Sequence, residues 1–105
     1  MAPAECNISF SINPQLASYD RLESWRIIDC VLSYIQSTGL PYFTGPSETT
    51  IEGPLDELLA VVAKAQRICI EQGAIHAVSH IKIYYDPKGK LAFNERLQRT
   101  LEHRG

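Results

Sequence analysis

The sequence predicts a single α+β domain in which a four-stranded antiparallel sheet packs against two helices. Three observations carry this prediction. Two stretches alternate apolar and polar residues, two longer stretches repeat apolar residues every three to four positions, and glycine and proline separate the elements. With 105 residues, 45% apolar and 21% charged, the chain has the length and composition of one globular domain. We therefore expect residues 1–105 to form a single domain.

The first strand and the first helix are expected in the N-terminal third of the chain. Residues 7–13 read N-I-S-F-S-I-N, an alternation typical of a half-buried strand, and Pro14 is expected to end it. Ser18 or Asp20 can cap the helix that follows, and Gly39 ends it. The apolar stripe of this helix is predicted to consist of Leu22, Trp25, Ile28, Leu32 and Ile35.

A hairpin and a second helix are expected next. Residues 40–53 contain two short β-prone runs around the turn sequence Gly45-Pro46-Ser47, which favours a β-hairpin. Pro54 can then open a helix, because the first helical residue needs no N–H donor, and Gly73 ends it. The apolar face of this helix is predicted to consist of Leu55, Leu58, Leu59, Val62, Ala65 and Cys69.

The last part of the chain predicts a fourth strand and a C-terminal helix. Residues 75–85 include the alternating run S-H-I-K-I-Y, and Phe93, Leu97 and Leu101 recur every four residues after it. The order β-α-β-β-α-β, with this extra helix, is that of a ferredoxin-like fold with both helices on one face of the sheet. The other face is expected to be polar, with Ser9, Ser11, Thr50, Glu52, His80, Lys82 and Tyr84 on it.

Charge, hydropathy and cysteine usage narrow the classes of function. The net charge of -2 and the scattered basic residues make nucleic acid an improbable partner. There is no apolar run of about 18 residues and no signal-peptide pattern, so we expect a cytoplasmic protein without a membrane partner. Cys6, Cys30 and Cys69 are odd in number and far apart, which favours reduced thiols over disulfides or a metal site. His76 and His80 are about 13 Å apart on a strand and cannot share a zinc ion.

Three segments together resemble the MTH1187/YkoF-like thiamine-binding superfamily, also called UPF0045 or DUF77. They are Ser11-Ile12-Asn13-Pro14, residues 45–53 (G-P-S-E-T-T-I-E-G) followed by L-D-E-L-L, and His80-Ile81-Lys82-Ile83. The resemblance implies a ferredoxin-like monomer that forms homodimers or homotetramers through its sheets. It also implies binding of thiamine or its aminopyrimidine (hydroxymethylpyrimidine) portion. No catalysis is implied, and therefore no catalytic cofactor; thiamine is expected as a ligand.

Given this resemblance, five residues are candidates for contacting the ligand. Glu48 is the first choice, because a carboxylate can accept hydrogen bonds from an aminopyrimidine and favours the thiazolium cation. Thr49, Ser11 and Ser79 offer small hydroxyl groups, and His80 lies on the polar face. Each has a structural alternative: Glu48 as a solvated hairpin acid, the hydroxyl residues as packing groups, and His80 as an ordinary exposed residue.

Two further interpretations stay open at this point. Glu52 is a weaker candidate than Glu48, and Trp25 is expected to be a core residue, since burial alone explains an aromatic at helical spacing. The alternative to a ligand-binding protein is a structural or regulatory oligomer without a small-molecule ligand.

Overall fold

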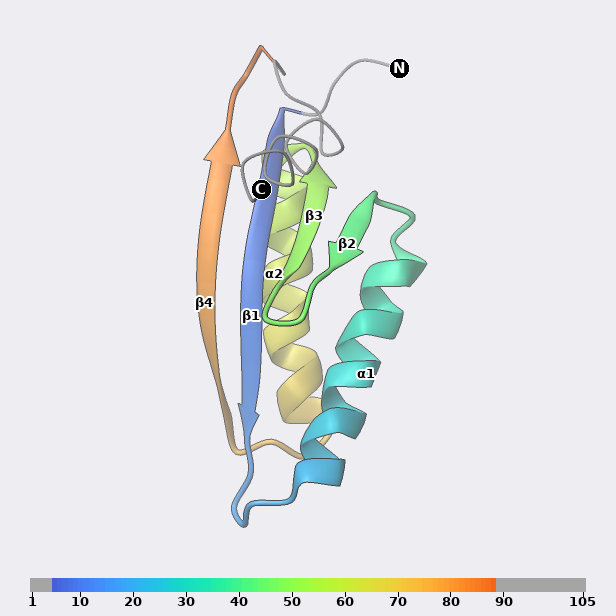
Figure 1. Ribbon diagram of the computed structural model, residues 1–105, viewed down its shortest axis with the longest axis vertical. Helices are drawn as coiled ribbons and strands as arrows, with labels where there is room; N and C mark the ends of the chain where they lie inside the picture. The colour runs from blue at the N-terminus through green and yellow to red at the C-terminus, as the bar shows by residue number, and fades with distance from the viewer. Residues whose placement is uncertain (1–4, 89–105) are drawn as a thin grey trace, which may run out of the picture.

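The computed structural model describes residues 5–88, which form a four-stranded antiparallel sheet with two helices on one side (Figure 1). In chain order the elements are β1 (Cys6–Gln15), α1 (Arg21–Ser37), β2 (Tyr42–Thr44), β3 (Thr49–Gly53), α2 (Leu55–Glu71) and β4 (His76–Tyr85). The strand order in the sheet is β2-β3-β1-β4. This confirms the ferredoxin-like α+β prediction. The predicted C-terminal helix around Phe93, Leu97 and Leu101 lies outside the described residues.

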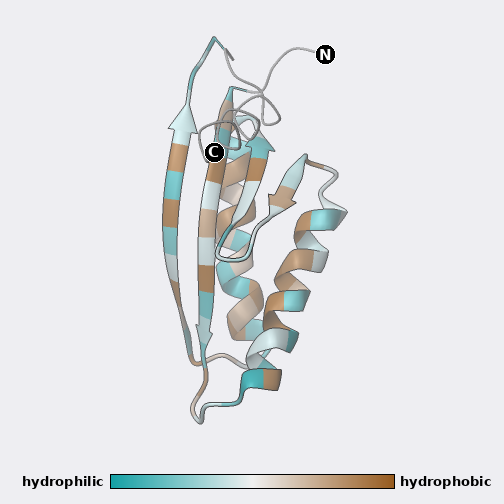
Figure 2. Ribbon diagram, in the orientation of Figure 1, coloured by the Kyte–Doolittle hydropathy of each residue, from teal (hydrophilic) through white to brown (hydrophobic). Residues whose placement is uncertain are grey.

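The core lies between the sheet and the two helices. Along β1 and β4 the hydropathy alternates from residue to residue, so each strand has one apolar side (Figure 2). Ile8 is fully buried and stands opposite Ile51 of β3 and Ile83 of β4. The buried hydrophobic residues are Cys6, Ile8, Phe10, Ile27, Val31, Ile35, Ile51, Leu58, Val61, Val62, Ala65, Ile68, Cys69 and Ala74.

The buried stripe of α1 differs from the predicted one. Ile27, Val31 and Ile35 face the core, whereas Trp25 is 54% exposed and carries the guanidinium of Arg21 at 5.1 Å from its ring centre. The prediction that Trp25 belongs to the core is therefore wrong. Apolar residues stand side by side along this helix, at 27–28 and at 31–32, so the pattern permits two faces and packing against α2 and β1 selects between them.

The first strand is longer than predicted, because Pro14 does not end it. β1 runs to Gln15, and Pro14 stands opposite Ala77 of β4. Beyond Phe10 no residue of β1 pairs with β3, so β1 has a partner on one side only at Pro14. A proline is tolerated at such a position because its missing N–H removes no bond to a second strand.

The second helix begins and buries its apolar face much as predicted. Its buried residues include the predicted Leu58, Val62, Ala65 and Cys69, whereas Leu59 is exposed. A feature not predicted is the cap of this helix. The Glu5 carboxylate accepts a hydrogen bond from the Leu55 N–H at 3.0 Å, which satisfies a free donor and places negative charge at the positive end of the helix.

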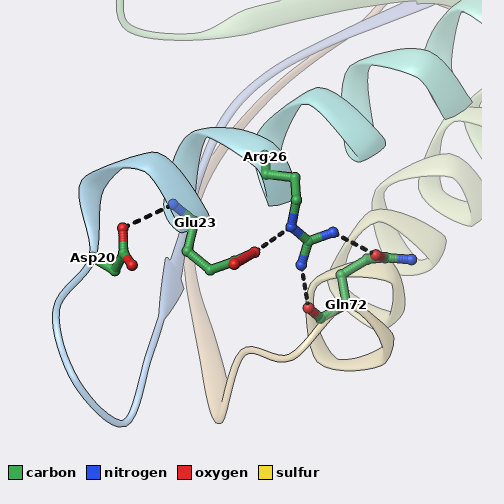
Figure 3. Close-up of polar contacts among 4 residues, drawn as sticks. All are labelled: Asp20, Glu23, Arg26 and Gln72. Atoms are coloured by element: carbon green, nitrogen blue, oxygen red, sulfur yellow. Dashed lines mark hydrogen bonds and ion pairs between the residues drawn. The ribbon is translucent and has the colours of Figure 1, made fainter.

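The start of α1 and the end of α2 are joined by polar contacts, which we call the Arg26 clasp (Figure 3). Asp20 caps α1 by accepting from the Glu23 N–H at 3.1 Å. The Arg26 guanidinium pairs with Glu23 and also donates to Gln72, to its side-chain oxygen at 2.9 Å and its main-chain oxygen at 2.8 Å. A single side chain thus supports both helix ends.

Candidate functional site

The candidate site is the sheet face that the helices leave uncovered, which we call the open face. Residues opposite each other in an antiparallel pair point to the same side, so the strand register assigns each side chain to a face. Read from β3 through β1 to β4, the rows of the open face are Glu52–Asn7–Tyr84, Thr50–Ser9–Lys82 and Ser11–His80, with Phe43 of β2 beside Thr50. This is the polar face expected from the sequence.

Two polar contacts organise the middle of the open face. The hydroxyl oxygens of Ser9 and Thr50 are 2.7 Å apart and form a hydrogen bond between β1 and β3. The Lys82 ammonium donates to the Glu48 carboxylate at 3.0 Å, and this ion pair spans β1, which lies between the two residues in the sheet. Lys82 therefore balances the charge of Glu48.

The five candidate residues divide between the two faces of the sheet. Glu48, Ser11 and His80 belong to the open face, as the register and the ion pair to Lys82 place them. Thr49 is opposite Phe10 and is buried on the helix-facing side. Ser79 is also on that side, where its hydroxyl donates to the side-chain oxygen of Gln66 in α2 at 2.7 Å. The structure thus brings three of the five together and separates two.

Glu52 and Asn7 are the polar residues that the open face buries most deeply. They stand opposite each other, and Glu52 is only 6% exposed. The sequence placed Glu52, Ser9 and Thr50 on this face, but it ranked Glu52 below Glu48. It did not name Asn7, Ser9 or Thr50 among the ligand contacts. Strand alternation predicts which face of the sheet these four side chains lie on, but it does not predict how deeply each one is buried.

The remaining chemistry-bearing groups do not form a further site within residues 5–88. No group of three or more histidine, cysteine or acidic residues in this range could hold a metal ion. Burial raises the pKa of the Cys6 and Cys69 thiols, with a smaller contribution from the charge of Glu5 at Cys6, so both stay protonated at neutral pH. None of the helices in the described range is long and apolar enough to cross a membrane.

Comparison of the amino-acid sequence with known proteins identifies the family of this chain. The sequence model of the family described as thiamine-binding protein matches residues 8–100. The chain belongs to the thiamine-binding protein family. A UPF0045 protein of Clostridium perfringens is 42% identical over 92 residues, which cover 88% of this chain and 93% of that protein. The resemblance inferred from the three sequence segments is thereby confirmed.

Solved structures of relatives share the fold. A DUF77 domain of Bacillus cereus superposes with a TM-score of 0.80 at 35% identity, covering 90% of this chain and 88% of that one. A Thermotoga maritima protein, described as a candidate in thiamine biosynthesis or salvage, superposes with a TM-score of 0.75 at 27% identity, covering 90% and 97%. These matches show that the fold is shared with relatives of this chain.

Proposed function

We propose that this protein is a cytoplasmic binder of thiamine or of its aminopyrimidine portion, and that it does not transform the ligand chemically. Membership of the thiamine-binding family and the likeness to the Thermotoga maritima protein support the ligand class. The structural observation that carries the proposal is the open face, where carboxylates, hydroxyls and aromatic rings lie within three rows of one sheet. The proposed partners are this small molecule and further copies of the chain, without nucleic acid or membrane.

The chemistry of the open face matches the chemistry of the ligand. Thiamine combines a flat aminopyrimidine, which offers N–H donors beside ring-nitrogen acceptors, with a positively charged thiazolium ring. A carboxylate on this face can accept from the amino group and favour the cation, and the hydroxyls of Ser9, Ser11 and Thr50 can donate to a ring nitrogen. Phe43 and Tyr84 frame these groups and offer ring surface for stacking.

We also propose that the protein self-associates through its sheet as a homodimer or homotetramer. β4 is an edge strand, and an edge strand presents backbone donors and acceptors that a second chain can pair with. Its side chains Ile81, Ile83 and Tyr85 are each about half exposed, which is apolar area that a second copy could cover. This observation also favours the second candidate function, a structural or regulatory oligomer without a small-molecule ligand.

Thermal unfolding with and without thiamine tests the proposal. A ligand at about 100 times its dissociation constant adds about 2.7 kcal/mol to the stability of the folded state, so the midpoint should rise. Size-exclusion chromatography with light scattering, run on the same samples, reports the mass of the assembly. A midpoint that is unchanged by thiamine, thiamine phosphates and hydroxymethylpyrimidine, together with a stable oligomer, would favour the ligand-free alternative.

A further inference from the structure

The carboxylate of Glu52 is buried without a partner. The residue is 6% exposed, and within residues 5–88 no hydrogen bond or ion pair engages its side chain. No side-chain oxygen or nitrogen in this range is both completely enclosed and unpaired. The Glu52 oxygens therefore keep a narrow opening to the surface of the open face. A buried carboxylate in this state is costly, because it has left water without gaining a counter-charge.

Glu48, four residues earlier, is in the opposite situation. It is half-buried, and Lys82 balances its charge at 3.0 Å. Four residues along a strand span about 13 Å, so Glu48 and Glu52 lie too far apart to bond to the same edge of one ring. Only one of the two acids can recognise the aminopyrimidine edge, and Glu52 is the one whose carboxylate has no counter-charge within residues 5–88.

The neighbours of Glu52 supply the complementary group. Thr50 is two residues earlier on the same face and shares a hydrogen bond with Ser9. Two hydroxyls that bond to each other use one of their two hydrogens, so one O–H remains to donate elsewhere. An acceptor at Glu52 beside a donor at the Ser9–Thr50 pair matches an amino group beside a ring nitrogen.

We propose that Glu52, and not Glu48, is the residue that selects the ligand, by accepting from the amino group of an aminopyrimidine and compensating the positive charge attached to it. The assignment rests on the proposed function, and it specifies the ligand class as a cationic heteroaromatic with an amino group adjacent to a ring nitrogen. The Glu48–Lys82 pair shapes the opposite end of the open face.

The proposal has a consequence for the protein without ligand. Because the unpaired charge destabilises the free protein, Glu52→Gln should raise the melting temperature in the absence of ligand while it weakens binding. A purely structural acid would behave in the opposite way, since its loss would lower the melting temperature. A variant with a higher melting temperature and a lower affinity is therefore expected only if Glu52 binds the ligand.

Calorimetric titration of the full chain with thiamine tests the assignment, with Glu48→Gln as the matched control. Loss of a hydrogen bond to a charged group corresponds to about 10- to 100-fold in affinity, which we expect for Glu52→Gln. Glu48→Gln should stay within about threefold of the wild type. The wild type should also prefer thiamine over its 4-oxo analogue, and Glu52→Gln should lose that preference.

The outcomes separate this assignment from the proposed function. Wild-type protein that binds neither thiamine nor hydroxymethylpyrimidine would refute both. Wild-type binding that Glu52→Gln leaves intact, or that Glu48→Gln weakens as much, would overturn the role of Glu52 alone. A lowered melting temperature of ligand-free Glu52→Gln would also overturn it. Should Glu52→Gln fail to fold, Glu52→Asp keeps the charge with a shorter reach, and unchanged affinity and analogue preference in that variant would count against the assignment.

Discussion

Replacing Ile8 by alanine should lower the free energy of unfolding by about 3 to 4 kcal/mol. Ile8 is fully buried in the strand at the centre of the core, with isoleucines opposite it on both neighbouring strands. The substitution removes three carbon atoms, and at about 0.8 kcal/mol for each buried carbon the transfer term is about 2.4 kcal/mol. The cavity left behind adds to this, within the range of about 2 to 5 kcal/mol measured for such truncations.

Ile83→Ala is the matched control, because Ile83 is the cross-strand neighbour of Ile8 but is 50% exposed. About half of the transfer term, roughly 1.2 kcal/mol, should be lost, and no closed cavity should form. Urea unfolding of both variants at two protein concentrations gives the two free energies. The concentration series matters because a residue covered by a second copy gives a midpoint that depends on protein concentration.

Two results would refute this reasoning. A loss below about 1 kcal/mol for Ile8→Ala would contradict the placement of β1 in the core. Equal, concentration-independent losses for the two variants would contradict the helix-covered arrangement, in which β1 is enclosed and the edge strand β4 is open.

The other predictions concern a helix cap, a close contact and the thiols. Asp20→Ala should cost about 1 kcal/mol in urea unfolding, because it removes the side-chain cap of α1, while Asp20→Asn should restore most of it. Gly53→Ala should lower the free energy of unfolding by about 1 to 3 kcal/mol, since its new methyl group would lie 3.1 and 3.3 Å from two leucine side chains. An unchanged urea midpoint would mean that these leucine side chains shift without cost. A thiol reagent at neutral pH should label the half-buried Cys30 before Cys6 and Cys69. Because burial raises the pKa of those two thiols, the folded protein holds their protons more tightly than the unfolded chain, so stability should fall as pH rises above about 8.5; stability that rises in this range would contradict the sign.

Most of the fold could be predicted because the patterns that define it are local. The alternation at Ile8, Phe10 and Ile12 has a period of two that no helix satisfies, and it assigned the polar residues from 7 to 13 to the opposite face. The orientation of α1 was less determined. Apolar residues at neighbouring positions gave two possible faces, and Trp25 was assigned to the wrong one because only tertiary packing distinguishes them.

The candidate site was harder to predict because its decisive features depend on residues far apart in the chain. Glu48 was identified as an acid on the hairpin, but its partner Lys82 is 34 residues later, so the ion pair has no local signature. The burial of Glu52 depends likewise on the arrangement of the strands around it. Thr49 and Ser79 were chosen for their hydroxyl groups. Strand alternation already placed Ser79 on the core side with Ile81 and Ile83, whereas the face of Thr49 became clear only from its pairing with Phe10.

The Arg26 clasp makes the two helix ends depend on each other. The last turn of a helix and the first turn of another are ordinarily the places where each frays independently, since their backbone groups lack helical partners. Here the guanidinium that supports Glu23 in the first turn of α1 also holds the Gln72 carbonyl after α2. Opening of either helix end breaks contacts that support the other end. Amide hydrogens at the two ends should therefore exchange with one common opening rate. In Arg26→Ala the two ends should open at two different rates.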